Sequence, residues 1–305
     1  MPEVAIMVEG QNGLNWPRWQ RIASAVEALS FAGLYRSDHF VKRDPPNRDS
    51  LDLWASLTWL ASHTQRIQFG PLVSPVSFRN PVATVITATA VDDLSGGRLT
   101  LGLGAGWQAR EHEMYGFDLL DIPQRFARFR EALTLVKSLL TSAEPISFDG
   151  RFFRLREASI LPRPQRPCGP PILIGGNGPR YTLPLAAEFA DEWNAAMIPP
   201  AQFAALNTQL DTLLAVRGRQ PGAVQRSLMT EVVFGRNDSE LRRKLEGRSA
   251  AELRERGVLV GGASELVAQL GALGDMGVQR VMLQWLDLDD LAGLEALAHT
   301  VLPQL

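Results

Sequence analysis

The chain has 305 residues, of which 45% are hydrophobic and 21% are charged, and its formal net charge is −2. A chain of this length and composition can bury a large core, and we expect one domain spanning residues 1–305. The near-neutral charge without a polybasic block excludes nucleic acid and anionic membranes as expected partners, and no apolar run approaches the ~18 residues of a membrane span. The single cysteine, Cys168, excludes an internal disulfide and a cysteine-built metal site.

The first predicted elements are a strand, a helix and a second strand. Residues Met1–Gly10 lack the basic segment and long apolar run of a signal peptide, so we expect a cytoplasmic protein. Val4–Val8 is a short apolar strand, Pro17–Phe31 has apolar residues at helical spacing, and Leu34–Ser37 is again strand-like.

The second strand ends at Asp38 and His39. In a barrel, side chains at this end of the strands build the site. A carboxylate beside an imidazole can fix the tautomer of the ring and raise its pKa, and both effects suit acid–base catalysis. The alternative is a hydrogen-bonded loop histidine next to a capping aspartate. We predict that His39 and Asp38 are catalytic residues.

A strand, a helix and a second strand form the centre of the predicted fold. Arg66–Phe69 alternates like a strand, and Asn80-Pro81 offers an N-cap and a first helical residue. The β-branched residues after Pro81 favour a strand. The length of this segment and the Gly96-Gly97 pair, which would end a helix, favour a buried helix instead. The next strand, Arg98–Leu103, leads into Gly104. Ligands gather beyond the carboxyl ends of such strands, so loops 72–79 and 104–110 should line the site.

The rest of the chain alternates between strands and helices, apart from one insertion. Residues 143–171 hold six prolines and an Asp149-Gly150 hairpin signal, and we expect a lid or covering flap. Residues 107–122 are expected to be a loop. The further predicted strands are Ile172–Ile174, Asp191–Ala196, Val224–Phe234 and Gln279–Trp285. The further predicted helices are Leu51–Ser62 capped by Ser50, Pro123–Leu140, one from Gly178 to Ala190, Pro199–Val216, Ser239–Glu255, Ser264–Met276 capped by Ser264, and Asp289–Leu302. Strands that alternate with helices in this way predict an α/β fold, a (β/α)8 TIM barrel with insertions, and an open doubly wound sheet is the alternative.

Two glycine-rich segments follow predicted strands. Gly102–Gly106 allows either tight packing of a strand end or close approach of the backbone to a ring or phosphate. Gly175–Gly178 precedes a predicted helix, whose first N–H groups attract phosphate. Trp107, Trp193 and Trp285 lie near strand ends and could floor a pocket for a ring, although buried aromatic residues are more often core.

Four segments, taken together, resemble the bacterial luciferase-like superfamily, and are most similar to its branch that uses the deazaflavin coenzyme F420. They are SDHF at 37–40, GPLVSPVSFRNP at 70–81, DDLSGGRLTLGLGAGW at 92–107 and PILIGGNG at 171–178. The resemblance covers nearly the whole chain in order. It implies a (β/α)8 barrel with insertions that binds the coenzyme ring at its carboxyl mouth.

The resemblance also implies roles for individual residues. The ring would rest on a bulge with a non-proline cis peptide, matching the Leu72–Val73 bond here. Asp38 would hydrogen-bond near the ring and to His39, and His39 would give or take a proton. The implied cofactor-binding residues are Asp38, Leu72, Val73, Ser74, Gly104, Ala105, Gly106, Trp107, Gly175, Gly176 and Asn177.

The implied activity is hydride transfer between F420 and a small organic substrate. The F420-dependent sugar-phosphate dehydrogenases carry a glutamate where Trp107 stands and a tryptophan within 41–43, so we expect a different substrate. One alternative is an FMN-dependent monooxygenase using reduced flavin and O₂, and another is a flavin-binding protein without catalysis. The anionic tail of F420 predicts cationic residues around the mouth, and their absence would favour FMN. Apolar helices near the central unit also lead us to expect a homodimer.

Overall fold

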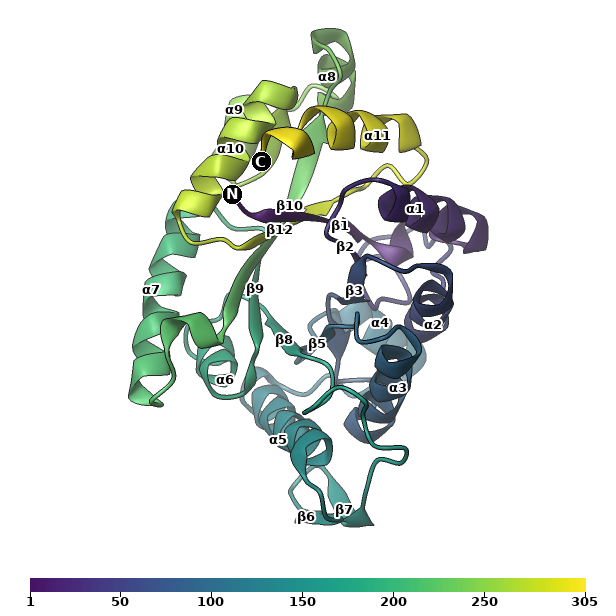
Figure 1. Ribbon diagram of the computed structural model, residues 1–305, viewed down its shortest axis with the longest axis vertical. Coiled ribbons are helices and arrows are strands. Elements are labelled where there is room, and N and C mark those ends of the chain that lie inside the picture. The colour runs from purple at the N-terminus through teal and green to yellow at the C-terminus, as the bar shows by residue number, and fades with distance from the viewer.

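Eight parallel strands form a closed barrel inside a ring of helices in the computed structural model, which describes residues 1–305 (Figure 1). The barrel strands are β1 (Glu3–Val8), β2 (Gly33–Arg36), β3 (Gln68–Pro71), β5 (Leu101–Gly104), β8 (Ile172–Gly175), β9 (Glu192–Ala196), β10 (Gln225–Phe234) and β12 (Arg280–Gln284). They are ordered β3-β2-β1-β12-β10-β9-β8-β5. Phe69 closes the ring, since its N–H donates to the Arg98 carbonyl (3.1 Å) and its carbonyl accepts from the Thr100 N–H (2.8 Å). The predicted (β/α)8 barrel is confirmed.

The helices cover the outer face of the barrel and bury its largest hydrophobic cluster, of 63 residues. They are α1 (Trp16–Ala28), α2 (Leu53–His63), α3 (Pro81–Leu94), α4 (Ala109–Tyr115), α5 (Ile122–Thr141), α6 (Thr182–Phe189), α7 (Pro200–Val216), α8 (Asp238–Leu245), α9 (Ala250–Glu255), α10 (Ala263–Asp275) and α11 (Leu291–Thr300). Two short strands extend the sheet, β4 (Ser74–Pro75) beside β5 and β11 (Leu259–Gly261) beside β10. None of the helices combines the length and apolar character needed to cross a bilayer.

The helix α3 forms although its β-branched residues favour a strand. The Asn80 side chain accepts hydrogen bonds from the N–H groups of Val82 (2.9 Å) and Ala83 (3.2 Å), as predicted. Gly96 and Gly97 follow the helix with φ values of 69° and 87°, which favour glycine. Local start and stop signals, together with burial of one face, outweigh intrinsic propensity here.

Two predicted N-caps are wrong, because α2 and α10 each begin after a different residue from the one predicted. Asp52, not Ser50, caps α2 by accepting from the Ala55 N–H (2.9 Å), while the Ser50 hydroxyl donates to the His39 carbonyl. The helix α10 begins after Gly262, whose N–H donates to the Glu265 carboxylate (3.1 Å), so Ser264 is not its cap.

Three predicted boundaries are also wrong. The predicted helix 239–255 is divided into α8 and α9 because Glu246 and Gly247 adopt φ values of 51° and 80°. The helix α6 begins at Thr182, several residues after the glycine-rich segment 175–178. Residues 107–122 are not all loop, since they contain α4.

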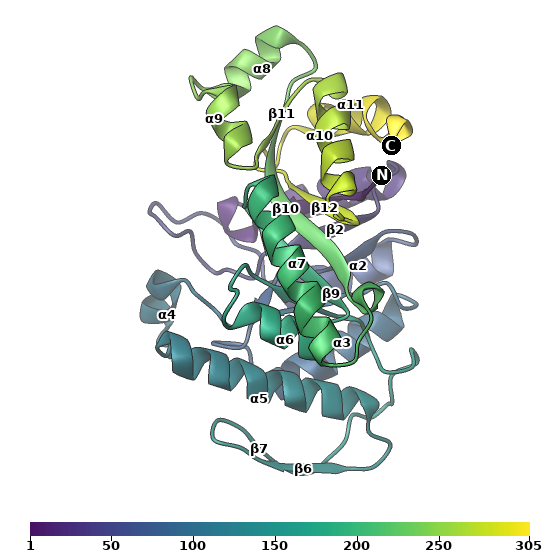
Figure 2. The same cartoon turned by 90° about the vertical axis from the view of Figure 1, so that its left-hand side faces the viewer.

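The insertion contains the predicted hairpin, formed by β6 (Ile146–Asp149) and β7 (Arg154–Ala158). Figure 2 shows the hairpin alongside α5, on the side away from the barrel strands. The Glu131 carboxylate on α5 accepts from three consecutive N–H groups of the hairpin turn, 151–153. No residue of 143–171 lines the pocket described below, and the role of this segment as a lid stays a prediction.

Arg280 of β12 bonds to side chains of four other strands inside the amino end of the barrel. Its guanidinium donates to Glu192 on β9 (2.8 Å) and to Glu3 on β1 (2.9 Å). It also donates to the Tyr35 hydroxyl (3.1 Å) and to Gln68 (2.7 Å). Burial raises the pKa of Tyr35 to about 12, so this oxygen accepts the bond as a neutral phenol.

Replacing Arg280 by methionine would leave the buried Glu192 carboxylate without its cationic partner. We expect Arg280→Met to lower the free energy of unfolding by about 3–5 kcal/mol, measured by urea denaturation. Adding Glu192→Gln should recover part of this loss, and Arg242→Met on the exposed side of α8 should cost little. A loss below ~1 kcal/mol in Arg280→Met would show that the network adds little to stability.

Candidate active site

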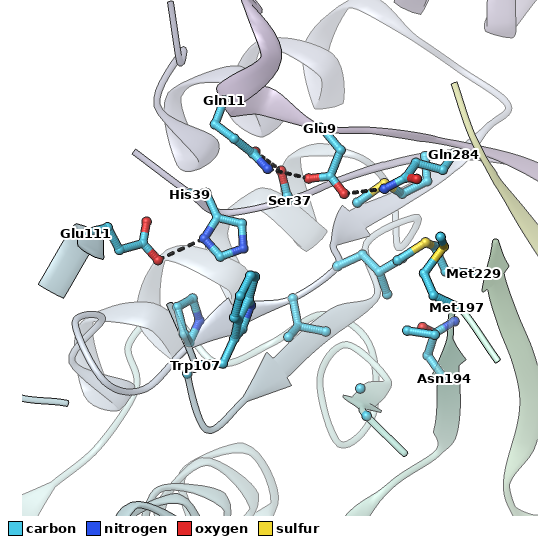
Figure 3. A pocket seen from close by; sticks show the side chains of 18 residues that line it. Glu9, Gln11, Ser37, His39, Trp107, Glu111, Asn194, Met197, Met229 and Gln284 are labelled. Carbon is cyan, nitrogen blue, oxygen red and sulfur yellow. Dashed lines mark hydrogen bonds and ion pairs between the residues drawn. The ribbon is translucent and has the colours of Figure 1, made fainter. Parts of the chain in front are cut away.

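A pocket of about 380 Å³ lies at the carboxyl ends of the barrel strands (Figure 3). All eight barrel strands, or the loops directly after them, contribute to its wall. The lining residues are Met7, Glu9, Gln11, Ser37, His39, Leu72, Val73, Pro75, Gly106, Trp107, Glu111, Gly175, Gly176, Asn194, Ala196, Met197, Met229 and Gln284. Pockets of this size and place in α/β barrels hold small molecules.

Val73 forms part of the pocket floor because three glycines leave room for its side chain. A Cβ at Gly104 would lie 2.5 Å from Val73 Cγ2, and a Cβ at Gly175 would lie 2.9 Å from Val73 Cγ1. A Cβ at Gly102 would lie 3.2 Å from the same Cγ1 atom. The Leu72–Val73 peptide is cis, as the family resemblance implies. At Gly102 and Gly104 the glycines therefore serve close packing, while Gly175 both packs on Val73 and lines the pocket.

His39 faces the pocket and is paired with Glu111 of α4. The distance between His39 Nδ1 and Glu111 Oε1 is 2.8 Å, and the other carboxylate oxygen accepts from the Phe40 N–H (3.1 Å). The Glu111 side chain is 1% exposed and that of His39 is 15% exposed. Burial lowers the pKa of His39, but the hydrogen bond and the charge of Glu111 outweigh it, so this pKa lies above its ordinary value.

The helix α4 is fixed to the loop after β2, which carries His39. The Gln108 amide donates to the Val41 carbonyl (2.9 Å), and the Arg110 guanidinium donates to the Lys42 carbonyl (2.7 Å). These bonds hold the loops after β2 and β5 together and thereby set the position of Glu111. Because residues 107–122 were predicted as loop, the sequence pattern did not identify Glu111. The only sequence signal for Glu111 as a site residue is its place one residue before His112, in a segment that begins after a glycine turn.

Asp38 is buried next to the pocket but does not line it, and it is not paired with His39. Its carboxylate accepts two hydrogen bonds from Arg79, at 2.7 and 3.0 Å, and one from the Ser74 hydroxyl at 2.9 Å. Such a bidentate pair holds the loops after β2 and β3 together. The expected bond between Asp38 and His39 is therefore wrong, and Glu111 takes the place of Asp38.

The other predicted binding residues divide into two groups. Leu72, Val73, Gly106, Trp107, Gly175 and Gly176 line the pocket, whereas Ser74, Gly104, Ala105 and Asn177 do not. The Asn177 side chain bonds to the backbone of Ala196 at both of its polar atoms, at 2.7 and 2.9 Å, which fixes the loop after β8. Trp107 is 56% exposed, and its ring meets the His39 ring edge-on at 5.6 Å between centroids. Trp193 is core, and Trp285 lines a different cavity.

A chain of polar side chains along another wall was not predicted. The Ser37 hydroxyl donates to the Gln11 carbonyl oxygen (2.6 Å), and the Gln11 amide donates to Glu9 (2.7 Å). The Gln284 amide donates to the other Glu9 oxygen (2.6 Å). These residues follow β1 and β2 or end β12, and they come together only because the barrel closes.

A family model described as luciferase-like monooxygenase matches residues 4–280, and the chain belongs to this family of oxidoreductases. It is 27% identical to the F420-dependent glucose-6-phosphate dehydrogenase of Intrasporangium calvum over 92% of both chains. It is 32% identical to the enzyme of the same name from Amycolatopsis mediterranei, over 52% of this chain and only 46% of that one. An F420-dependent secondary alcohol dehydrogenase, in complex with an F420–acetone adduct, shares the fold with a TM-score of 0.87, 16% identity and coverage of 100% of this chain and 99% of that one. The family resemblance inferred from the motifs is confirmed.

The pocket suits a planar ring. Leu72 and Val73 provide an apolar floor, and Gly175 and Gly176 add backbone without side chains beside it. Gly176 has a φ of 128°, a conformation that a residue with a Cβ rarely adopts. A flat heterocycle such as deazaflavin or flavin fits these residues, and it would supply the redox chemistry that the side chains lack.

Replacing Glu111 by glutamine should lower the pKa of His39, because burial then acts without the opposing carboxylate. NMR titration of the histidine ring protons measures this change, and Glu113→Gln on the exposed side of α4 is the matched control. In the wild type, the stability that the pair provides is present at pH values below the unfolded histidine pKa. It is lost as pH rises through the raised native pKa. An unchanged His39 pKa in Glu111→Gln would contradict this assignment.

Proposed function

We propose that the protein is an F420-dependent oxidoreductase that acts on a small organic carbonyl compound or alcohol. The pairing of His39 with Glu111 at a pocket suited to a planar ring is the observation that carries this proposal. The names of the relatives support F420 as the coenzyme. A sugar-phosphate substrate is not favoured, because no lysine or arginine lines the pocket to receive a phosphate group.

When bound, the reduced coenzyme would supply the hydride chemistry that converts a carbonyl compound into an alcohol. His39, whose pKa is raised by its pairing with Glu111, would give a proton from its imidazolium form to the carbonyl oxygen, and the product would be an alcohol. In the reverse direction the neutral imidazole would accept the alcohol proton. Val73 and the glycines beside it would support one face of the ring, and Trp107 would limit access of water near His39.

The FMN-dependent monooxygenase remains a second candidate, because the pocket lining contains no lysine or arginine for an anionic coenzyme tail. Two arginines next to the pocket are engaged elsewhere. Arg79 is paired with Asp38, and Arg125 donates to the Gly106 carbonyl (3.0 Å). If F420 binds, its tail would therefore have to lie outside the pocket, toward the exposed rim.

Parallel titrations of the purified protein with F420 and FMN should show saturable binding of F420, at least about tenfold tighter than that of FMN. A tenfold difference corresponds to ~1.4 kcal/mol of binding free energy. Absorbance and fluorescence of the two coenzymes provide the measurement. Tighter binding of FMN, with O₂ consumed when reduced flavin is supplied, would reject the F420 proposal in favour of the monooxygenase.

Replacing His39 by alanine should lower turnover by roughly 10²–10⁴-fold, the usual contribution of a general acid or base. Turnover is measured as oxidation of reduced F420 by a panel of ketones and aldehydes. Affinity for F420 should change little in this variant. His299→Ala, exposed on α11, is the control. Turnover of His39→Ala within about threefold of the wild type would exclude His39 as the acid or base.

A further inference from the structure

We propose that Glu9 selects the substrate of this pocket, favouring molecules with an apolar body and an ammonium or hydroxyl donor and excluding those with an anionic group at that position. This inference rests on the proposed function, because it concerns the substrate of the same site. It assigns a chemical class that neither the motifs nor the relatives provide.

The orientation of the Glu9 carboxylate is fixed by a directional chain of hydrogen bonds. The Gly10 N–H donates to the Ser37 hydroxyl (2.9 Å), so the hydroxyl proton is directed to the Gln11 carbonyl oxygen. The Gln11 NH₂ group must then face Glu9, and the Gln284 NH₂ group reaches the other oxygen. Glu9 consequently accepts one hydrogen bond at each of its two carboxylate oxygens.

Glu9 forms no direct ion pair, although its charge interacts at longer range with the buried Arg36 and with His39. None of the ion pairs in the structure includes Glu9, whereas Glu111, the other acid of the pocket, is paired with His39. The buried Arg36 lies behind Gly10, where its guanidinium is taken up by Ser56 and by backbone carbonyls. The pocket wall therefore has one unpaired carboxylate and no lysine or arginine.

Figure 3 shows where this charge lies relative to the rest of the pocket. Glu9 lies between two groups of lining residues, with Gln284, Met197 and Met229 to one side of it and His39 and Trp107 to the other. Each carboxylate oxygen has a second acceptor position, which a ligand donor can use. The flexible methionine side chains suit an apolar body of variable shape. An anionic group in this place would meet like charge in a partly dry environment, which is strongly unfavourable.

Three probes with the same ring and different charge test the proposal: cyclohexylammonium, cyclohexanol and cyclohexanecarboxylate. Ligand-observed NMR titrations at pH 7.5 and 0.15 M salt give their affinities, with and without saturating F420. Distant surface charges are largely screened at this ionic strength. We expect the ammonium and the alcohol to bind, and the ammonium to bind at least about tenfold more tightly than the carboxylate.

In Glu9→Gln, the affinities for the ammonium and the carboxylate should differ by no more than about threefold, because the local charge is removed. Glu113→Gln, which changes the net charge of the protein equally but lies outside the pocket, should keep the wild-type ratio. Equal affinities in the wild type, no binding of either the ammonium or the alcohol, or a ratio unchanged in Glu9→Gln would each overturn the proposal. The titrations without F420 test the role of Glu9 even if the coenzyme does not bind. Failure of the proposed F420-dependent function can therefore be told apart from failure of the Glu9 proposal.

Discussion

The pairing of Glu111 with His39 is the interaction on which the proposed chemistry of this pocket depends. His39 is largely buried, and burial alone would lower its pKa and leave it neutral. The carboxylate reverses the direction of that shift and orients the ring through Nδ1, so that the opposite edge of the imidazole is available to a ligand. The protein achieves this by placing a short helix, α4, directly after the glycine turn that ends β5.

The floor of the pocket depends on a different constraint, which is steric. Val73 packs where glycines of β5 and β8 leave space, so the loop after β3 lies deep in the barrel mouth. Ion pairing holds the same loop from the other side, because Arg79 of this loop binds Asp38 of the loop after β2. The two arrangements together bring the carboxyl ends of β2, β3, β5 and β8 around one cavity. In our proposal, acid–base chemistry and the support of a planar ring would thus come from separate parts of the barrel.

Much of the fold could be predicted because it is encoded locally. Asn80 and the Gly96-Gly97 pair delimit α3 despite a β-branched interior, and strand-like runs locate all the barrel strands to within a few residues. The errors arise where several polar residues compete for one backbone position. At the start of α2, Asp52 caps in preference to Ser50, since an ionised carboxylate accepts a stronger hydrogen bond than a hydroxyl.

The site was predicted less completely, for a physical reason. Position at a strand end identified His39 and Trp107, and the family resemblance identified Val73. The partner of His39 depends on a contact over a separation of 72 residues. Asp38 is adjacent in sequence, yet its backbone position directs the carboxylate to Arg79 instead. The chain from Ser37 to Gln284 likewise exists only because β1 lies between β2 and β12. Such pairings are set by closure of the barrel and have no short-range sequence signal.

The central claim is that a planar redox coenzyme lies on Val73 within reach of His39. A crystal structure of the protein with oxidised F420 tests it most directly. We expect electron density for the deazaflavin ring against Val73, Gly175 and Gly176, with His39 still bonded to Glu111 and facing the ring or the substrate space beside it. Density for the coenzyme outside this pocket, or an imidazole turned away from it, would contradict the claim.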